Sequence, residues 1–243
     1  MSSITRESQA GPAAAQFLSS VRNRPHRAPF AFLFDLGRLI GAAAKMLSQM
    51  RDRLLRSGVF DRAVWTILDD AIALQGAEYG NVQLLADDEL VIVAQRGLRP
   101  EFLRTFRHVK REDGCACGRA LRRGRSVVIP DVEADAEFAV FRSDARLAGF
   151  RAVQSTPLIT RRGEPLGVVS THFANVHHPT KIEMETLQAY GVIASEIAFE
   201  LLGETPLLTM ARRLSRDLYD RIGVHVAATI SADGGIGDER EWS

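Results

Sequence analysis

Two cysteines separated by one alanine, Cys115 and Cys117, are the residues of this sequence best suited to covalent chemistry. They stand at the start of a predicted short helix, where the partial positive charge of a helix N-terminus lowers a thiol pKa and makes the thiol more reactive. Oxidised together, they would close a strained ring. We expect a packed thiol at a helix start, and thiol redox chemistry is the alternative.

The histidines do not suggest a metal site. His172, His177 and His178 lie near one another in the sequence, but neither they nor the two cysteines have the spacing of a zinc knuckle. The pair before Pro179 is typical of a loop that leads into a helix. We therefore predict no metal, and the sequence requires no cofactor.

Strand-like and helical segments alternate around these residues. Residues 126–129 form a β-branched run that ends at a proline, which predicts a buried strand. Residues 151–159 and 166–174 are longer strand-like runs joined by a polar, glycine-containing turn, so they predict a β-hairpin. A second hairpin is predicted upstream, from residues 82–85 and 90–94.

Short helices are predicted between the two hairpins. Residues 100–106, 117–123 and 138–147 carry an apolar residue every three or four positions and few β-branched residues. Strand pair, short helices with one strand among them, and strand pair together predict an antiparallel sheet with helices packed across it, which is an α+β fold.

Four motifs resemble those of bacterial GAF domains. They are CGRAL at 117–121, DV at 131–132, QSTPL at 154–158 and LGVVSTH at 166–172. The resemblance is closest to sensor histidine kinases and related two-component proteins, and it covers roughly residues 58–203. It implies a sensory α+β fold with an antiparallel central sheet and covering helices. It does not imply one ligand, because GAF pockets bind cyclic nucleotides, haem, bilins or small metabolites.

A pocket in such a fold is expected between the sheet and residues 138–150. Aromatic residues would form its apolar walls, and a thiol and a few polar side chains would orient a ligand. The candidate binding residues are Cys117, Phe138, Phe141, Phe150, Gln154, Thr156, Ser170 and His172. The alternative is that these phenylalanines are ordinary core and that the polar groups satisfy one another.

The sequence lacks most of the motifs by which GAF domains bind their known ligands. Residues 182–185 do not carry the phenylalanine and acidic pair of cyclic-nucleotide GAF domains, and neither cysteine lies beside a histidine as in bilin attachment. Haem needs only one histidine, so the sequence leaves it open. An anionic ligand, or simply exposed helix faces, would account for the arginines around the expected pocket, which are Arg119, Arg122, Arg123, Arg125, Arg142, Arg146 and Arg151.

Residues 30–57 predict a long helix with a heptad seam. Apolar residues alternate at spacings of three and four, at Leu33, Leu36, Ile40, Ala43, Leu47, Met50 and Leu54. The last long helix, about residues 180–202, offers similar spacings. We expect the N- and C-terminal helices to form a bundle across a homodimer, and the alternative is that both helices simply cover the sheet.

Composition sets the remaining limits. The predicted organisation is a disordered tail at 1–29, the heptad helix at 30–57, a GAF domain at 58–203, a helical extension at 204–230 and a disordered tail at 231–243. A transit peptide would share the composition of the first tail. No run is apolar enough for a membrane span. The net charge of +1 and the paired charges of residues 207–222 argue against nucleic acid.

The predicted function is a non-enzymatic, cytoplasmic sensor of an unknown small molecule that signals through its terminal helices. The two cysteines suit a reducing cytosol. No kinase, cyclase or helix-turn-helix module is evident, so a separate signalling protein would carry the output. One alternative is a methionine sulfoxide reductase-like enzyme, whose pattern Cys117-Gly118 matches in part although only Cys115 accompanies it. The other is a ligand-free dimerisation scaffold.

Overall fold

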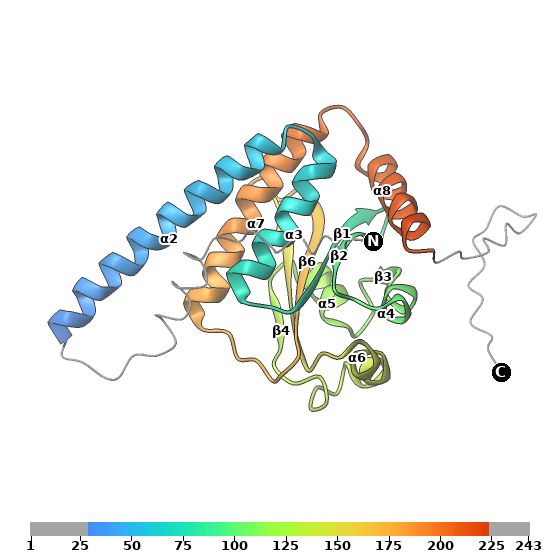
Figure 1. Cartoon of the computed structure of the whole chain (residues 1–243), viewed down its shortest axis with the longest axis horizontal. Coiled ribbons are helices and arrows are strands. Elements are labelled where there is room, and N and C mark those ends of the chain that lie inside the picture. Colours follow the sequence, from blue (N-terminus) through green and yellow to red (C-terminus); the bar gives the residue numbers. More distant parts are fainter. Residues whose placement is uncertain (1–28, 224–243) are drawn as a thin grey trace, which may run out of the picture.

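The protein is built on one curled antiparallel sheet (Figure 1). A computed structural model describes the backbone of residues 29–223 and the side chains of residues 41–223. The strand order is β3-β2-β1-β6-β5-β4. The strands are β1 Tyr79–Ala86, β2 Glu89–Arg96, β3 His108–Lys110, β4 Val127–Ile129, β5 Ala152–Ile159 and β6 Pro165–Phe173. The α+β fold and both predicted hairpins are confirmed, while the short strand β3 was not predicted.

Two long helices, α3 Phe60–Gln75 and α7 Lys181–Leu202, cover one face of the sheet. A third, α2 Pro29–Ser57, packs on these two helices. Gly58 separates α2 from α3 at a positive φ of 70°, a conformation that glycine adopts without strain. Thr180 and Glu183 cap the start of α7 reciprocally. Apolar residues of the three helices and of the sheet form one continuous core on this face, which we call the helix face.

Short elements cover the other face. They are α4 Pro100–Thr105, α5 Ala116–Arg123, the 3₁₀ turn η1 Ala139–Phe141 and α6 Arg142–Ala148. They agree closely with the three predicted short helices. Their apolar side chains form a second core against the sheet. We call this side the cavity face, because it holds the cavity described below.

The central strands approach each other closely. Gly167 of β6 lies opposite Leu84 of β1, and a β-carbon at Gly167 would collide with the backbone carbonyl of Gln83. Only glycine therefore fits this position without moving one strand. The close approach fixes the register of β6 against β1, and that register decides which side chains share a face.

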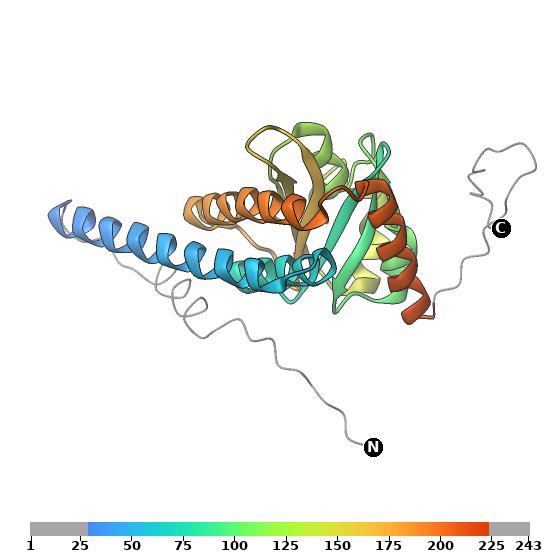
Figure 2. The same cartoon turned by 90° about the horizontal axis from the view of Figure 1, so that it is seen from above.

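Helix α2 extends well beyond the body of the domain (Figure 2). Of the predicted seam, Met50 and Leu54 are buried in the core with α3 and α7, while Ala43 and Leu47 are half-buried. Leu33, Leu36 and Ile40 lie outside the residues whose side chains are described. The predicted tails, 1–29 and 231–243, likewise fall outside the described residues, except that Pro29 starts α2.

The last helix, α8 Leu207–Arg221, folds back onto the hairpin formed by β1 and β2 instead of continuing α7. Within α8, Arg213 forms an ion pair with Asp217, four residues further along the helix. Arg221 donates to the backbone carbonyl of Asp217. Arg213 also reaches Asp61 of α3, so this surface of α8 is tied to the domain.

Candidate functional site

A small cavity lies between the sheet and the short elements. The space open to the centre of a water molecule is about 10 Å³, which is room for roughly one water. Strands, α4, α5 and the segments around α6 all contribute to its wall. The lining residues are Asn81, Phe102, Phe106, Cys115, Ala116, Cys117, Phe138, Phe150, Val153, Ser155, Ser170 and His172.

A row of polar side chains crosses three strands at the floor of the cavity. Asn81 of β1 lies opposite Ser170 of β6, and Ser170 lies opposite Ser155 of β5. Residues directly opposite in a sheet project to the same side. The two serine hydroxyls are hydrogen-bonded, with their oxygens 2.7 Å apart. The row therefore consists of one satisfied pair and one neighbouring amide.

Two buried polar atoms beside this row have no hydrogen-bond partner among the described residues. They are Oδ1 of Asn81 and Nδ1 of His172. A buried polar atom without a partner costs free energy. Burial also lowers the pKa of His172 from 6.5 to about 3, so its imidazole is neutral at physiological pH. The cavity thus offers hydrogen-bonding atoms without charge.

Aromatic rings enclose His172. Phe102 of α4 and Phe150, which follows α6, meet the imidazole edge-on at centroid distances of 5.3 and 4.7 Å. Phe138 packs against Phe150 in turn. These rings come from separate short elements, so a shift of α4 or of the segment around α6 would change the size of the cavity.

The two cysteines contact each other at the cavity wall. Their Sγ atoms are 3.4 Å apart, and both thiols are free and buried. The hydrogen bond from the Cys117 thiol lowers the pKa of Cys115. The same interaction and burial raise the pKa of Cys117. Cys115 is therefore the thiol that loses its proton more readily, and it stands at the N-cap of α5.

The structure gathers most of the predicted binding residues at this cavity. Cys117, Phe138, Phe150, Ser170 and His172 line it. Phe141 does not, and its ring packs instead against those of Phe106 and Phe138.

Gln154 and Thr156 lie on the opposite face of the sheet, so their placement with Ser170 and His172 was wrong. Successive residues of a strand point to opposite sides. Because Ser155 faces the cavity, its two neighbours face α7. The methyl group of Thr156 would lie 3.6 Å from a β-carbon added at Gly191 of α7, which places it beneath that helix.

Several lining residues were not predicted. Asn81 was missed because the upstream strand was expected to begin at residue 82, whereas β1 begins at Tyr79. Phe102 and Phe106 were assigned to a helix without a role. The sequence did contain a signal for Asn81, because it is a polar residue beside an apolar strand-like run. A buried polar residue in such a place is more often functional or hydrogen-bonded than ordinary core.

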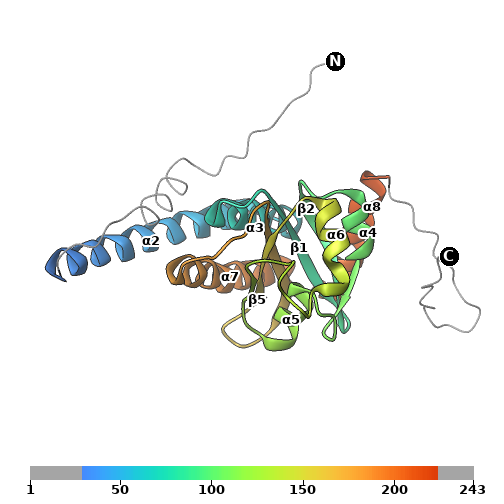
Figure 3. The same cartoon turned by 90° about the horizontal axis from the view of Figure 1, so that it is seen from below.

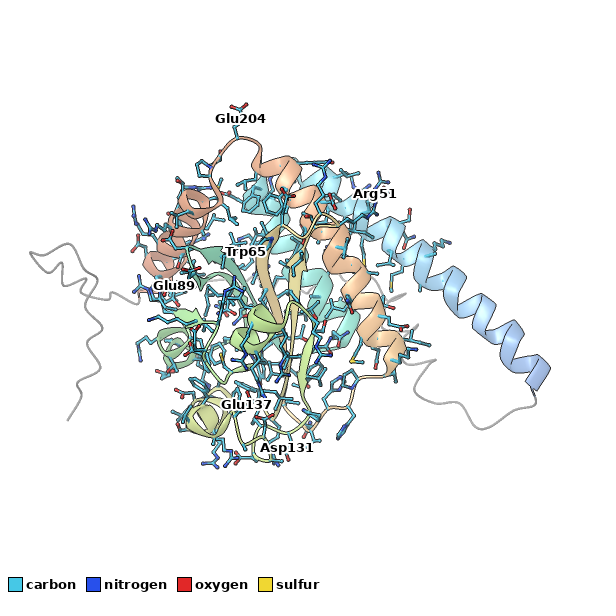
Figure 4. The ribbon with its side chains drawn as sticks, turned by 180° about the vertical axis from the view of Figure 1, so that it is seen from behind. Arg51, Trp65, Glu89, Asp131, Glu137 and Glu204 are labelled. Atoms are coloured by element: carbon cyan, nitrogen blue, oxygen red, sulfur yellow. The ribbon has the colours of Figure 1, made fainter. Side chains whose placement is uncertain are left out.

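The arginines near the cavity are matched by a loop that carries an acidic residue at every second position, residues 131–137. Arg151 pairs with Asp131, Arg146 with Glu133, Arg119 with Asp135, and Arg119, Arg122 and Arg123 with Glu137. Arg142 donates to backbone carbonyls of the same loop. Figure 4 shows Asp131 and Glu137 at the end of the molecule remote from Glu204. The acidic side chains of this loop thus form ion pairs with five of the seven arginines.

Two further properties concern the part of the chain that the structure describes. Within residues 29–223 no three His, Cys, Asp or Glu side chains gather as they would around a metal ion. None of the described helices combines the length and apolarity needed to cross a membrane.

Comparison with solved structures places the fold. A GAF domain from an Acinetobacter phosphoenolpyruvate-protein phosphotransferase matches with a TM-score of 0.54 at 13% identity, covering 65% of this chain and 93% of that one. The free methionine-R-sulfoxide reductase of Neisseria meningitidis matches with a TM-score of 0.50 at 18% identity, covering 71% and 92%.

A third likeness is to the chromophore-binding domain of a bacteriophytochrome from R. palustris, with a TM-score of 0.50 at 16% identity. It covers 65% of this chain, which spans only 61% of that domain. At these identities the likenesses establish the fold alone. No curated protein matches the sequence. The family model described as GAF domain matches residues 60–197, more than half of the chain. This protein therefore belongs to the GAF domain family.

Proposed function

We propose that this protein is a cytoplasmic sensor that binds an uncharged small molecule in the cavity and signals through its helices as a homodimer. The observation that carries the proposal is the pair of buried, unpartnered atoms, Asn81 Oδ1 and His172 Nδ1, beside the cavity. A ligand that donates to one or both atoms recovers hydrogen bonds that the protein alone leaves unmade.

The lining favours a neutral, flat ligand. Among the described residues that line the cavity there is no Asp, Glu, Lys or Arg, and the imidazole of His172 is neutral. A charged ligand would lose its hydration without gaining a counter-charge. Edge and face contacts with the surrounding phenylalanines suit a planar molecule. Because the cavity holds about one water, such a ligand requires the short elements to move outward.

Dimerisation is supported by the course of α2. This helix has 29 residues, and its first half runs past the end of α7 (Figures 2 and 3). Most of the stability of a helix in a protein comes from packing its apolar face. The heptad spacing continues along the projecting part of α2, and a second copy of the helix is the partner that would pack on this seam.

The first test is native mass spectrometry of the protein purified from its own host. A dimer carrying a discrete extra mass supports the proposal, and a bare monomer contradicts the dimer. A bare dimer favours the alternative of a ligand-free scaffold. The matched control is Asn81→Leu, which should lose the extra mass and keep the dimer. The identified molecule should stabilise the wild type by about 2.7 kcal/mol at a hundred times its dissociation constant.

The thiol contact favours a second candidate function, a thiol-dependent reductase. Cys115 and Cys117 are already 3.4 Å apart, and Cys115 is the more acidic thiol. One structural neighbour is named a free methionine-R-sulfoxide reductase. The test is reduction of free methionine sulfoxide by wild type and Cys117→Ser in the presence of a dithiol reductant. Activity that is lost in the variant supports the enzyme, and zero activity in both removes it.

A further inference from the structure

Helix α8 joins the two faces of the sheet. Ala211 and Leu214, in its first half, pack into the core of the helix face. Leu218 and Tyr219, in its last turns, pack into the core of the cavity face. Figure 1 shows α8 beside the β1–β2 hairpin, and Figure 3 shows its end beside α4. This helix therefore contacts both the layer that carries α2 and the layer that encloses the cavity.

Tyr219 attaches the end of α8 to α4. Its buried hydroxyl donates a hydrogen bond of 2.6 Å to the backbone carbonyl of Leu103. The guanidinium of Arg107, just beyond α4, lies 4.5 Å from the centroid of the tyrosine ring. Burial raises the pKa of Tyr219, so the hydroxyl stays protonated and remains a donor. One side chain of α8 thus contacts both α4 and the residues that follow it.

The same short helix forms a wall of the cavity. Phe102 lies directly before Leu103, and Phe106 follows at the end of α4, and both rings line the cavity. Their rings stack at a centroid distance of 4.4 Å, so they move together. An outward shift of α4 that enlarges the cavity would also displace the carbonyl that Tyr219 binds.

We propose that α8 is a latch on the cavity: it holds α4 closed through Tyr219, and opening of the cavity and release of the end of α8 are one coupled event. Coupling of this kind is reciprocal. A molecule that wedges α4 outward loosens α8, and a variant that loosens α8 opens the cavity. The signalling meaning of the latch rests on the proposed sensor function, whereas the coupling itself requires no ligand.

The cysteines provide a direct assay of opening. Cys115 and Cys117 line the cavity and are the only two cysteines of the chain, so their modification rate by the thiol reagent DTNB reports access to it. Tyr219→Phe removes the hydroxyl and keeps the ring beneath Arg107. Loss of one hydrogen bond of ordinary strength should raise the labelling rate about fivefold. The rate is measured in the full chain without denaturant and at several low urea concentrations.

The matched control is Arg212→Gln, which also removes one polar contact of α8. That contact is to Asp87 in the β1–β2 turn, not to α4. We expect its labelling rate to stay within a factor of two of wild type. Equal rates in the two variants would overturn the latch. So would a Tyr219→Phe rate with the urea dependence of global unfolding, because a local opening is nearly independent of urea.

The reciprocal experiment starts from the cavity. Phe102→Leu reduces the wall of the cavity and leaves every side chain of α8 unchanged, and hydrogen exchange of the α8 amides is then compared with wild type. Faster exchange in the last turn of α8, with unchanged exchange in α7, is the expected result. Unchanged exchange in α8 would contradict the coupling. If the coupling is found and no ligand is ever retained, the latch stands and the sensor function fails.

Discussion

The two faces of the sheet bury polar side chains in different ways. On the helix face, Asp70 of α3 is fully buried and has two strong partners. Tyr190 of α7 donates a hydrogen bond of 2.8 Å to Oδ2, and Arg53 of α2 lies 2.6 Å from Oδ1. On the cavity face, Asn81 and His172 keep atoms without partners. Gln154 and Gln75 are exceptions on the helix face, because both side-chain amide atoms of Gln154 and Oε1 of Gln75 have no partner among the described residues.

Buried polar groups therefore have different roles on the two faces. The Asp70 network joins α2, α3 and α7 and so positions the projecting helix on the domain. Its groups are occupied by each other, which leaves nothing for a ligand. The cavity face instead has short elements and unmet hydrogen bonds, and such a site gains free energy when something else supplies the missing partner. Under the proposed function, stability and recognition are assigned to opposite sides of the sheet.

The largest expected effect is the pH dependence of Asp70. Burial raises the pKa of this carboxyl from 3.8 to about 6, so the folded state binds the proton more tightly than the unfolded state. The resulting stability is fully present below about pH 4 and is lost as the pH rises through 6. The shift corresponds to about 3 kcal/mol.

The measurement is urea unfolding of wild type and Asp70→Asn between pH 4.5 and 7.5, and the informative quantity is the difference between the two proteins. Half-buried carboxylates such as Asp131 and Glu133, whose arginine partners lower their pKa, change stability in the opposite direction but are common to both proteins. A difference that does not vary with pH would mean that Asp70 is not the buried titrating group.

Tyr190→Phe should have the next largest effect. It removes the hydroxyl that bonds a buried carboxylate, and hydrogen bonds to charged groups contribute about 2 kcal/mol. We expect that loss at pH 7.5 and about half of it at pH 5, where Asp70 is protonated. The same substitution in an Asp70→Asn background is the control, and it should cost about 1 kcal/mol at both pH values.

Asn81→Leu tests the other face. Replacing an amide whose oxygen is unpaired by an apolar side chain of similar size removes a desolvation cost, so we expect the stability to change by less than about 1 kcal/mol. Chemical denaturation of the variant beside Tyr190→Phe makes the contrast direct. A loss above about 2 kcal/mol would show that Asn81 is hydrogen-bonded in solution, for example to a buried water.

The smallest effect is expected at the acidic loop. Arg146 forms two hydrogen bonds with Glu133, at 2.8 and 2.6 Å, but the arginine is exposed. Surface ion pairs contribute little and are screened by salt. The unfolding midpoint of Arg146→Met should match that of wild type within error, at low and high salt alike. A clear loss confined to low salt would assign the loop a structural role of its own.

The fold was predictable from local patterns, whereas the membership of the site was not. The β5–β6 hairpin follows from two strand-like runs around a turn with Gly163. Which residues share a face depends on pairing Ser155 with Ser170, and a bulge between Leu158 and Ile159 sets that register. The sequence does not show where this bulge lies. Gln154 and Thr156 were therefore predicted to share a face with Ser170 and His172, whereas they lie on the helix face.

The burial of Asp70 could have been predicted from the spacing of apolar residues in its helix. Asp70 stands three residues after Ile67 and four before Leu74, both of which are buried in the helix-face core. A carboxylate at that spacing on an apolar helix face is a buried charge in need of a partner. The partner residues, Arg53 and Tyr190, come from other helices, so only the tertiary structure identifies them.

The length of α2 means that a small rotation where it meets the domain becomes a large displacement at its far end. At about 1.5 Å per residue, its 29 residues extend roughly 43 Å, and among its described side chains those of Met50 and Leu54 are buried in the domain. A rigid arm held at one end amplifies angular change, because a tilt of a few degrees at the anchor moves the far tip by several ångströms. Rearrangements in the domain too small to alter its outline would therefore be large at the distant end of the arm.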